Sequence, residues 1–178
     1  MLNARLQAEL YPPSPDKKER KCRDIVFREG DKVMQIKNNY DIPWEREVMG
    51  RRQDGIGIFN GDIGVIEQIN LMEETMQMSF DDRHVTYDFS MLDELEHAYA
   101  VTVHKSQGSE DPVVILPVYR YTMKLLTRNL LYTAVTRASR MVIMVGDEET
   151  IHKMIANNRQ TKRYTGLPYY FAEYHDNT

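Results

Sequence analysis

The sequence predicts an α/β protein in which a parallel sheet carries a small inserted antiparallel β unit. From residue 98 onward, apolar strand-like stretches alternate with amphipathic helical stretches, an order typical of a parallel sheet covered on both faces. Residues 49–64 hold five of the nine glycines, and alternating apolar and polar residues follow them, as in antiparallel hairpins. The expected parts are residues 1–57 and 93–178 of one α/β domain, with the insert at 58–92.

Helical spacing of Leu2, Leu6 and Leu10 predicts a helix that ends before "YPPSP". Because this helix has almost no lead-in, we expect the sequence to be a piece of a longer protein. The stretch "DKKERK" is interpreted as a polar linker, and "DKVMQI" after it as a strand.

Two hairpins are expected in the glycine-rich and acidic region. Asn60 and Gly61 stand between "IGIF" and "DIGVI", and this dipeptide favours a two-residue hairpin turn in which both residues take positive φ. A second hairpin is predicted at residues 76–89, where apolar and polar residues alternate on either side of "DDR". Together they indicate a small antiparallel barrel or sheet.

The remaining elements follow the α/β order. "SMLD" has a capping-box pattern and predicts a short helical turn. The expected strands are 98–103, 113–118 and "MVIMVG" ending at Gly146, and the expected helices are about 123–138 and 148–157. Asp147 is interpreted as the cap of the last helix rather than as a magnesium ligand.

The composition is typical of a globular protein without disulfide bonds or membrane spans. The chain has 178 residues, of which 42% are hydrophobic and 28% charged, and its single cysteine excludes a disulfide framework. An intracellular, cytoplasmic location is the expectation. No apolar run is long enough for a membrane span, and no signal-peptide pattern opens the chain.

The charge is uneven along the chain. The net charge of −4 argues against a simple basic nucleic-acid-binding domain. Residues 62–99 hold ten acidic residues against one arginine, whereas residues 100–145 hold six Lys/Arg against two acids. The basic half is therefore where contacts with a polyanion are expected.

The segment "AYAVTVHKSQGSE" ends an expected strand in polar side chains. Ligands of open parallel sheets bind where strands end. His104, Lys105, Ser106 and Gln107 are donors suited to phosphate oxygens. Gly108 allows close backbone approach, and Glu110 is suited to a ribose hydroxyl or a cation. An ordinary polar loop with a turn glycine is the alternative.

Arg137 stands near the end of the helix "LLTRNLLYTAVTRAS". A cation there is also favoured by the helix dipole alone.

Three other kinds of site are disfavoured or absent. A hydrolase triad of His104, Ser106 and Asp111 is disfavoured because all three residues lie on one loop and cannot easily converge. The histidines share no zinc-ligand spacing. No G-x-x-x-x-G-K-[ST] phosphate-binding loop occurs.

Two of these segments carry a resemblance to a known family. "AYAVTVHKSQGSE" resembles motif V of superfamily 1 helicases, and "LLYTAVTRA" resembles their motif VI. With "FNGDIG", "LNARLQAELYPP" and "GDKVMQIKNNYD" before them, the order is similar to the RecD-like branch, the exodeoxyribonuclease V alpha subunit family. The similarity covers most of residues 1–165, with Ser139 standing where many relatives have a basic residue.

The resemblance implies a fold and a function. It implies the second RecA-like lobe (P-loop NTPase fold) of an ATP-dependent 5′–3′ DNA helicase of repair and recombination, with a Src-homology-3-like barrel inserted. The first lobe, which binds most of the ATP and Mg²⁺, would lie upstream, so this chain alone is expected to be inactive. Single-stranded DNA and that lobe are the expected partners. Whether nuclease subunits also bind stays open.

The resemblance also implies roles for single residues. Those expected to face DNA are Thr102, His104, Lys105 and Ser106, and those expected to face the nucleotide are Gln107, Gly108, Glu110 and Arg137. Arg137 would be catalytic, reaching the γ-phosphate across a cleft and pointing at solvent when the other lobe is missing.

Two other function classes remain open. One is a related motor: a Pif1-like, phage or RNA helicase, or a conjugative relaxase-helicase. The other is a non-catalytic protein-binding module that has kept helicase residues.

Overall fold

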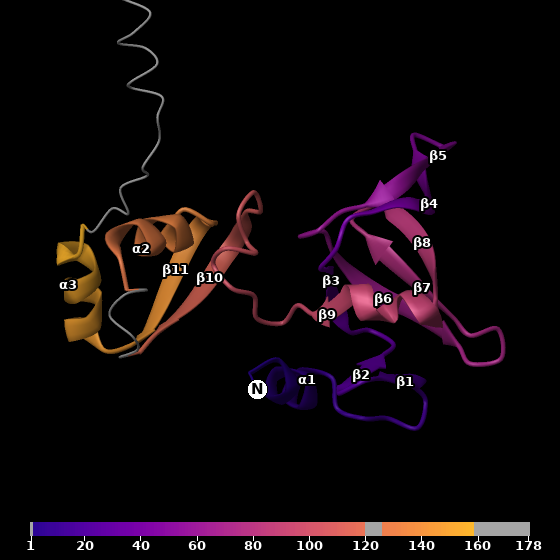
Figure 1. The fold of residues 1–178 in the computed structure, drawn as a ribbon, viewed down its shortest axis with the longest axis horizontal. Coiled ribbons are helices and arrows are strands. Elements are labelled where there is room, and N and C mark those ends of the chain that lie inside the picture. The colour runs from indigo at the N-terminus through magenta and orange to yellow at the C-terminus, as the bar shows by residue number, and fades with distance from the viewer. Residues whose placement is uncertain (1, 120–125, 159–178) are drawn as a thin grey trace, which may run out of the picture. The chain divides into compact units, whose positions relative to one another are not determined.

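The computed structural model describes residues 2–119 and 126–158. The chain divides into two compact units, Met1–Ser106 and Gln107–Thr178 (Figure 1). No helix in the described ranges is long and apolar enough to span a membrane.

The first unit begins with one helix, and the rest of it is mostly antiparallel β structure. Helix α1 (Leu2–Leu10) confirms the expected N-terminal helix. Strands β1 (Glu19–Cys22) and β2 (Ile25–Arg28) then form a two-stranded hairpin. The linker interpretation of "DKKERK" is therefore wrong in its last residues: their polar side chains do not prevent the backbone from pairing with β2, whose Phe27 enters the core.

Seven strands build the main sheet of this unit. They are β3 (Lys32–Gln35), β4 (Asn39–Val48), β5 (Arg51–Ile58), β6 (Ile63–Asn70), β7 (Thr75–Phe80), β8 (Arg83–Asp88) and β9 (Leu95–His97), with the 3₁₀ helix η1 (Phe89–Glu94) before the last. Their order is β5-β4-β8-β7-β6-β3-β9, and every pair is antiparallel. The insert was expected to start at residue 58. The antiparallel sheet also contains β3, β4 and β5, which begin before that residue.

The alternating pattern of residues 76–89 gives the hairpin that it predicts. β7 pairs with β8 from Thr75–Asp88 to Phe80–Arg83. The inward residues Met76, Met78, Phe80 and Tyr87 have no exposed surface. Burial of one face of each strand therefore holds the register, because a slip by one residue would expose all of them.

The hairpin predicted at Asn60 and Gly61 is wrong. The turn exists, because Asp62 N donates to Phe59 O at 3.0 Å, but β5 pairs with β4 while β6 pairs with β3 and β7. Gly61 has φ +101° whereas Asn60 is not among the residues with positive φ. A positive φ at the third position alone fits a type II turn, which does not bring two strands into a tight hairpin.

A tight two-residue turn in which both residues have positive φ lies instead at Met49 and Gly50. Both have positive φ, 51° and 72°, and they join Val48 to its partner Arg51 in the β4–β5 hairpin. A methionine at such a position gives no sequence signal, since asparagine, aspartate and glycine are the residues that favour it.

The expected strand at residues 98–103 is also wrong. β9 ends at His97, and Ala98 N still donates to the carbonyl of Lys32 in β3 at 2.8 Å, but residues 99–103 belong to no strand. The backbone of Ala100 bonds instead to the side chain of Asn3, whose Oδ1 accepts from Ala100 N at 2.7 Å and whose Nδ2 donates to Ala100 O at 3.0 Å. A side-chain amide thus replaces the strand neighbour that the apolar pattern suggested.

The second unit contains a small parallel sheet. Strand β10 (Asp111–Val118) pairs in parallel with β11 (Ala138–Gly146), and helix α2 (Arg128–Val135) lies between them in the chain. Helix α3 (Glu148–Ala156) follows, capped by Asp147 as expected. The predicted helix at 123–138 is thus shorter within the described residues, and residues 123–125 lie outside them.

The parallel strands are not covered on both faces by the described residues. Val113, Ile115, Met141 and Ile143 are between 40% and 66% exposed. The core of this unit comprises Val118, Leu126, Leu131 and Met154. Side chains of both helices pack against Leu116 and Val118 on one face of β10. The opposite face stays exposed, so the expectation of a sheet covered on both faces is wrong for the described part of this unit.

Candidate functional site

The residues expected to face DNA lie on one turn of the first unit, after β9. Ser106 N donates to Thr102 O at 3.1 Å, and Lys105 N donates to Thr102 Oγ1 at 3.3 Å. Ser106 Oγ donates to the carbonyl of Val103 at 2.9 Å. His104 is exposed. These hydrogen bonds gather Thr102, His104, Lys105 and Ser106 into one compact segment.

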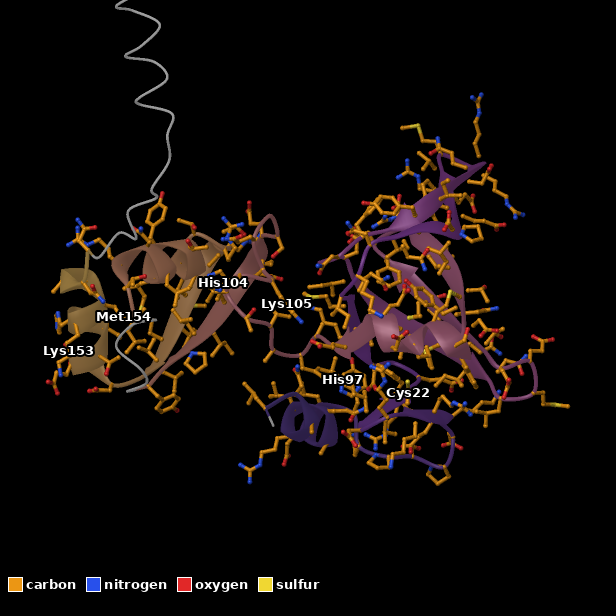
Figure 2. All side chains as sticks on the ribbon, viewed as in Figure 1. Cys22, His97, His104, Lys105, Lys153 and Met154 are labelled. Carbon is orange, nitrogen blue, oxygen red and sulfur yellow. The ribbon has the colours of Figure 1, made fainter. Side chains whose placement is uncertain are left out.

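Lys105 has an acidic partner that the sequence analysis missed. Its Nζ lies 2.7 Å from Glu96 Oε2, and the two side chains are 37% and 49% exposed. Figure 2 labels Lys105 on the turn that follows His97. Exposed ion pairs contribute little to stability, so a phosphate group can compete with Glu96 for this ammonium group.

A buried polar cluster, which we call the Asp31 cluster, holds the chain just before this turn. It consists of Gln7, Asp31, His97, Tyr99 and the backbone N–H of residue 28. Asp31 has no exposed surface. Its Oδ1 accepts from Tyr99 OH at 2.7 Å, and its Oδ2 accepts from Gln7 Nε2 at 2.6 Å and lies 3.2 Å from His97 Nε2.

The cluster keeps Asp31 ionised. Burial raises the pKa of this carboxyl, but hydrogen bonds from His97, Tyr99 and the Arg28 backbone outweigh it, and the pKa lies below its usual value. Burial and the hydrogen bond to Asp31 raise the pKa of Tyr99 far above its usual value, so its hydroxyl stays a donor. Helix α1, the sheet and residues 97–100 are therefore joined around one carboxylate.

The residues expected to face the nucleotide belong to the second unit. Gln107, Gly108 and Glu110 are exposed. Gly108 has φ +91°, and a Cβ built there would meet no atom within 4 Å. The glycine is needed for this backbone conformation, and it leaves open space beside the chain.

Arg137 connects the loop to helix α2. It follows the helix, and its Nη1 donates to the carbonyl of Ser109 at 2.9 Å. In return, Asp111 N donates to the Arg137 carbonyl at 2.8 Å. The expectation that Arg137 points at solvent is wrong, because the residue is half-buried between these partners. Its buried Nε has no hydrogen-bond partner within the described residues.

Comparison with family models gives two matches. Residues 2–80 match the SH3 domain of ATP-dependent RecD-like DNA helicases, and this range lies in the unit with the seven-stranded sheet. Residues 97–145 match the UvrD-like helicase C-terminal domain, a range that contains both segments with helicase resemblance. The chain belongs to the RecD-like helicase family.

Similar curated proteins agree with this assignment. The chain is 38% identical over 113 residues to the RecBCD enzyme subunit RecD of Mycolicibacterium smegmatis, covering 64% of this chain and 19% of that protein. It is 31% identical over 135 residues to the ATP-dependent RecD2 DNA helicase of Deinococcus radiodurans, covering 76% and 17%. An uncharacterised Methanocaldococcus jannaschii protein, MJ1519, is 32% identical over 146 residues, covering 76% and 12%.

The match is thus to one part of larger proteins. This RecD-like chain spans only 12% to 19% of the length of these three relatives. Its antiparallel unit and its small parallel sheet agree with the SH3-like part and, in outline, with the α/β part of the expected fold.

Proposed function

We propose that this chain is the C-terminal motor lobe of an ATP-dependent 5′–3′ DNA helicase. In this proposal, Thr102, His104, Lys105 and Ser106 contact a single DNA strand, and Arg137 is the arginine finger of ATP hydrolysis. The remaining nucleotide contacts come from Gln107, Gly108 and Glu110. Association with nuclease subunits would follow the pattern of the relatives named as RecBCD subunits.

The observation that carries the proposal is the contact between Arg137 and Ser109. These residues come from the two segments that resemble helicase motifs, and they meet through a 2.9 Å hydrogen bond. An arginine beside an open glycine turn suits a phosphate group, because the guanidinium presents a planar fork of donors.

Arg137 would act on charge that develops during hydrolysis. A fixed guanidinium near the γ-phosphate neutralises negative charge in the transition state, and it needs little reorganisation if its position is already held. The hydrogen bond to Ser109 provides such positioning.

The described residues fit a phosphate better than they fit Mg²⁺. No group of three or more His, Cys, Asp or Glu side chains that could hold a metal ion occurs among them. In this proposal Mg²⁺ and most of the ATP contacts belong to another lobe, because this sequence contains no phosphate-binding loop. The exposed apolar faces of β10 and β11 support an additional lobe or further strands, because parallel sheets are normally buried.

The first prediction tests the whole proposal on the chain alone. The purified chain should show no ATP hydrolysis, with or without single-stranded DNA, because its sequence contains no phosphate-binding loop. It should bind a labelled single strand weakly in fluorescence anisotropy. DNA-stimulated hydrolysis that a point substitution in this chain abolishes, or absence of DNA binding at low salt, would contradict the proposal.

The second prediction concerns the Lys105–Glu96 pair. Lys105→Ala should weaken binding of single-stranded DNA and flatten the log–log salt dependence by about 0.7, the contribution of one phosphate contact. Glu96→Gln should raise the affinity for single-stranded DNA by up to about fivefold, because the ammonium no longer has to leave a carboxylate whose pairing is worth about 0.2–1 kcal/mol. Titrations at several salt concentrations measure both effects.

A matched control lies on helix α3. Glu149 pairs with Lys153 at 2.5 Å, with side chains 60% and 40% exposed. Glu149→Gln removes the same charge from a similar pair and should leave DNA affinity unchanged. Equal gains from both glutamine variants would indicate a nonspecific effect of net charge.

A further inference from the structure

An exposed pair of aromatic rings lies on the first unit. Tyr40, near the start of β4, and Phe59, directly after β5, are 62% and 41% exposed. Their ring centroids are 5.6 Å apart and their planes meet at 67°, an edge-to-face arrangement. Phe80 and Tyr87 of the same sheet are fully buried, so the sheet does enclose aromatic rings where packing requires them.

The pair is held in place. A Cβ built at Gly57 would lie 2.9 Å from Phe59 Cζ, so the ring of Phe59 packs directly over that glycine. Tyr40 OH accepts a hydrogen bond from Asn38 Nδ2 at 3.1 Å. The Oδ1 of Asn38 in turn accepts from Asn60 N at 3.0 Å. Rings fixed in this way lose little conformational entropy when a ligand stacks on them.

The turn that carries Phe59 lies beside the turn that carries Lys105. Phe59 and Asp62 close the first turn, and a Cβ built at Gly61 within it would lie 4.0 Å from the carbonyl oxygen of Lys105. All of these residues belong to the first unit. The exposed rings and the lysine that we assign to phosphate therefore lie on neighbouring segments.

The nearby acidic side chains are only partly neutralised by cations. Asp62 pairs with Arg83 at 2.9 Å, Asp93 pairs with Lys37 at 2.8 Å, and Lys105 is itself paired with Glu96. Asp41, next to Tyr40 in the chain, is exposed, and Glu94 accepts a hydrogen bond from Asn39 Nδ2 at 3.0 Å. Because the surface is not strongly basic, phosphate contacts alone would give it a modest affinity for DNA, and base stacking would have to supply the remaining binding free energy.

We propose that Tyr40 and Phe59 form a stacking platform for the bases of a single DNA strand whose phosphates contact the Lys105 turn. This inference rests on the proposed function, because it extends the same DNA contact. Bases stack on aromatic rings with little dependence on sequence, since every base has a π face. A protein partner is less well matched, because a stable protein interface buries about 800 Å² on each side, far more than two rings offer.

The test compares two oligonucleotides that carry equal numbers of phosphates, a 15-nucleotide poly-dT and its abasic counterpart. The wild-type chain should bind poly-dT on the order of tenfold more tightly, as expected for stacking of one or two bases. The double variant Tyr40→Leu/Phe59→Leu should bind both oligonucleotides equally, with an unchanged salt slope. Leucine keeps apolar volume at both positions but has no π face.

Tyr132→Leu is the matched control. Tyr132 is a 70% exposed aromatic residue of α2 in the other unit, and its loss should leave the preference for poly-dT intact. A second readout is 2-aminopurine placed within the strand. Its emission should be quenched on binding to the wild-type chain and restored with the double variant, as stacking on a ring requires.

The outcomes separate this inference from the proposed function. Equal wild-type affinity for both oligonucleotides overturns the platform while the DNA-binding lobe stands. A double variant with normal preference and quenching also overturns it, because residues other than these two rings would then stack the bases. If neither oligonucleotide binds at low salt, the proposed DNA contact fails and the platform fails with it.

Discussion

In the helicase that we propose, with this chain joined to an ATP-binding lobe, Arg137→Ala should lower ATP turnover by roughly 10³-fold or more, the usual scale for an arginine finger. Affinities for nucleotide and for DNA should change far less. The reason is that the guanidinium matters most when charge develops in the transition state. Steady-state ATPase assays with separate binding titrations measure the three quantities.

Arg137→Lys separates this role from a structural one. Lysine can still donate to the carbonyl of Ser109, which Arg137 contacts at 2.9 Å, but it lacks the planar fork that grips two phosphate oxygens. We expect little rescue of turnover. Strong rescue would show that the residue chiefly holds the loop, and near-normal turnover in the alanine variant would remove Arg137 from catalysis.

Arg140→Ala is the matched control for this pair of variants. Arg140 is an exposed arginine on β11, three residues further along the chain. Its removal changes the net charge by the same amount and should leave turnover near normal. A melting curve of each variant excludes loss of folded protein, because the helix-end role of a cation is worth only about 0.3–1 kcal/mol.

Asp31→Asn should lower the free energy of unfolding by about 3 kcal/mol. Asp31 is fully buried, and Gln7 and Tyr99 donate to its carboxylate. An amide offers one oxygen and turns two N–H donors toward groups that are themselves donors. Each buried donor left unmatched costs about 1–3 kcal/mol. Denaturant titration of the chain measures the loss.

Asp93→Asn is the control for that variant. Asp93 likewise has more than one side-chain partner, the cations Lys37 and Arg23, but these pairs are exposed to solvent. Exposed pairs contribute little, so this substitution should change stability far less. Equal losses from both variants would contradict the central role of the Asp31 cluster.

The same cluster predicts a pH dependence. The folded-state pKa of Asp31 lies below its ordinary value of 3.8. Above that ordinary value the carboxylate is ionised in both states, and its stabilisation is fully present. As the pH falls further, the unfolded state binds the proton first, so the stabilisation is lost. The slope of stability below about pH 4 should be smaller in Asp31→Asn than in the wild type.

Local patterns in the sequence were enough to predict several elements. Alternation places Met76, Met78 and Phe80 on the buried face of β7, and Asp147 caps α3. Each of these outcomes depends on neighbours within a few residues, or on which face of a strand is apolar. The family resemblance was likewise readable from contiguous segments, and the family models confirm it.

The candidate site could be predicted only as a set of residues. Motif resemblance singled out Lys105 and Arg137, but it did not reveal Glu96 or the carbonyl of Ser109 as their partners. Glu96 lies nine residues before Lys105 and is one acid among ten in its region. Nothing in a linear pattern distinguishes the acid that folds against the lysine from the others.

By itself, the sequence determined the family and the positions of most strands and helices, and it predicted which side chains would contact DNA and nucleotide. Only the tertiary structure decided how the strands pair, why residues 98–103 leave the sheet, and how Arg137 is held. The two strands beside Asn60 and Gly61 take other neighbours, and Asn3 takes the place of a strand partner for Ala100. The physical reason is the same throughout. Backbone polar groups and buried charges must find hydrogen-bond or ion-pair partners. Those partners come from segments distant in the sequence, on which local propensity carries no information.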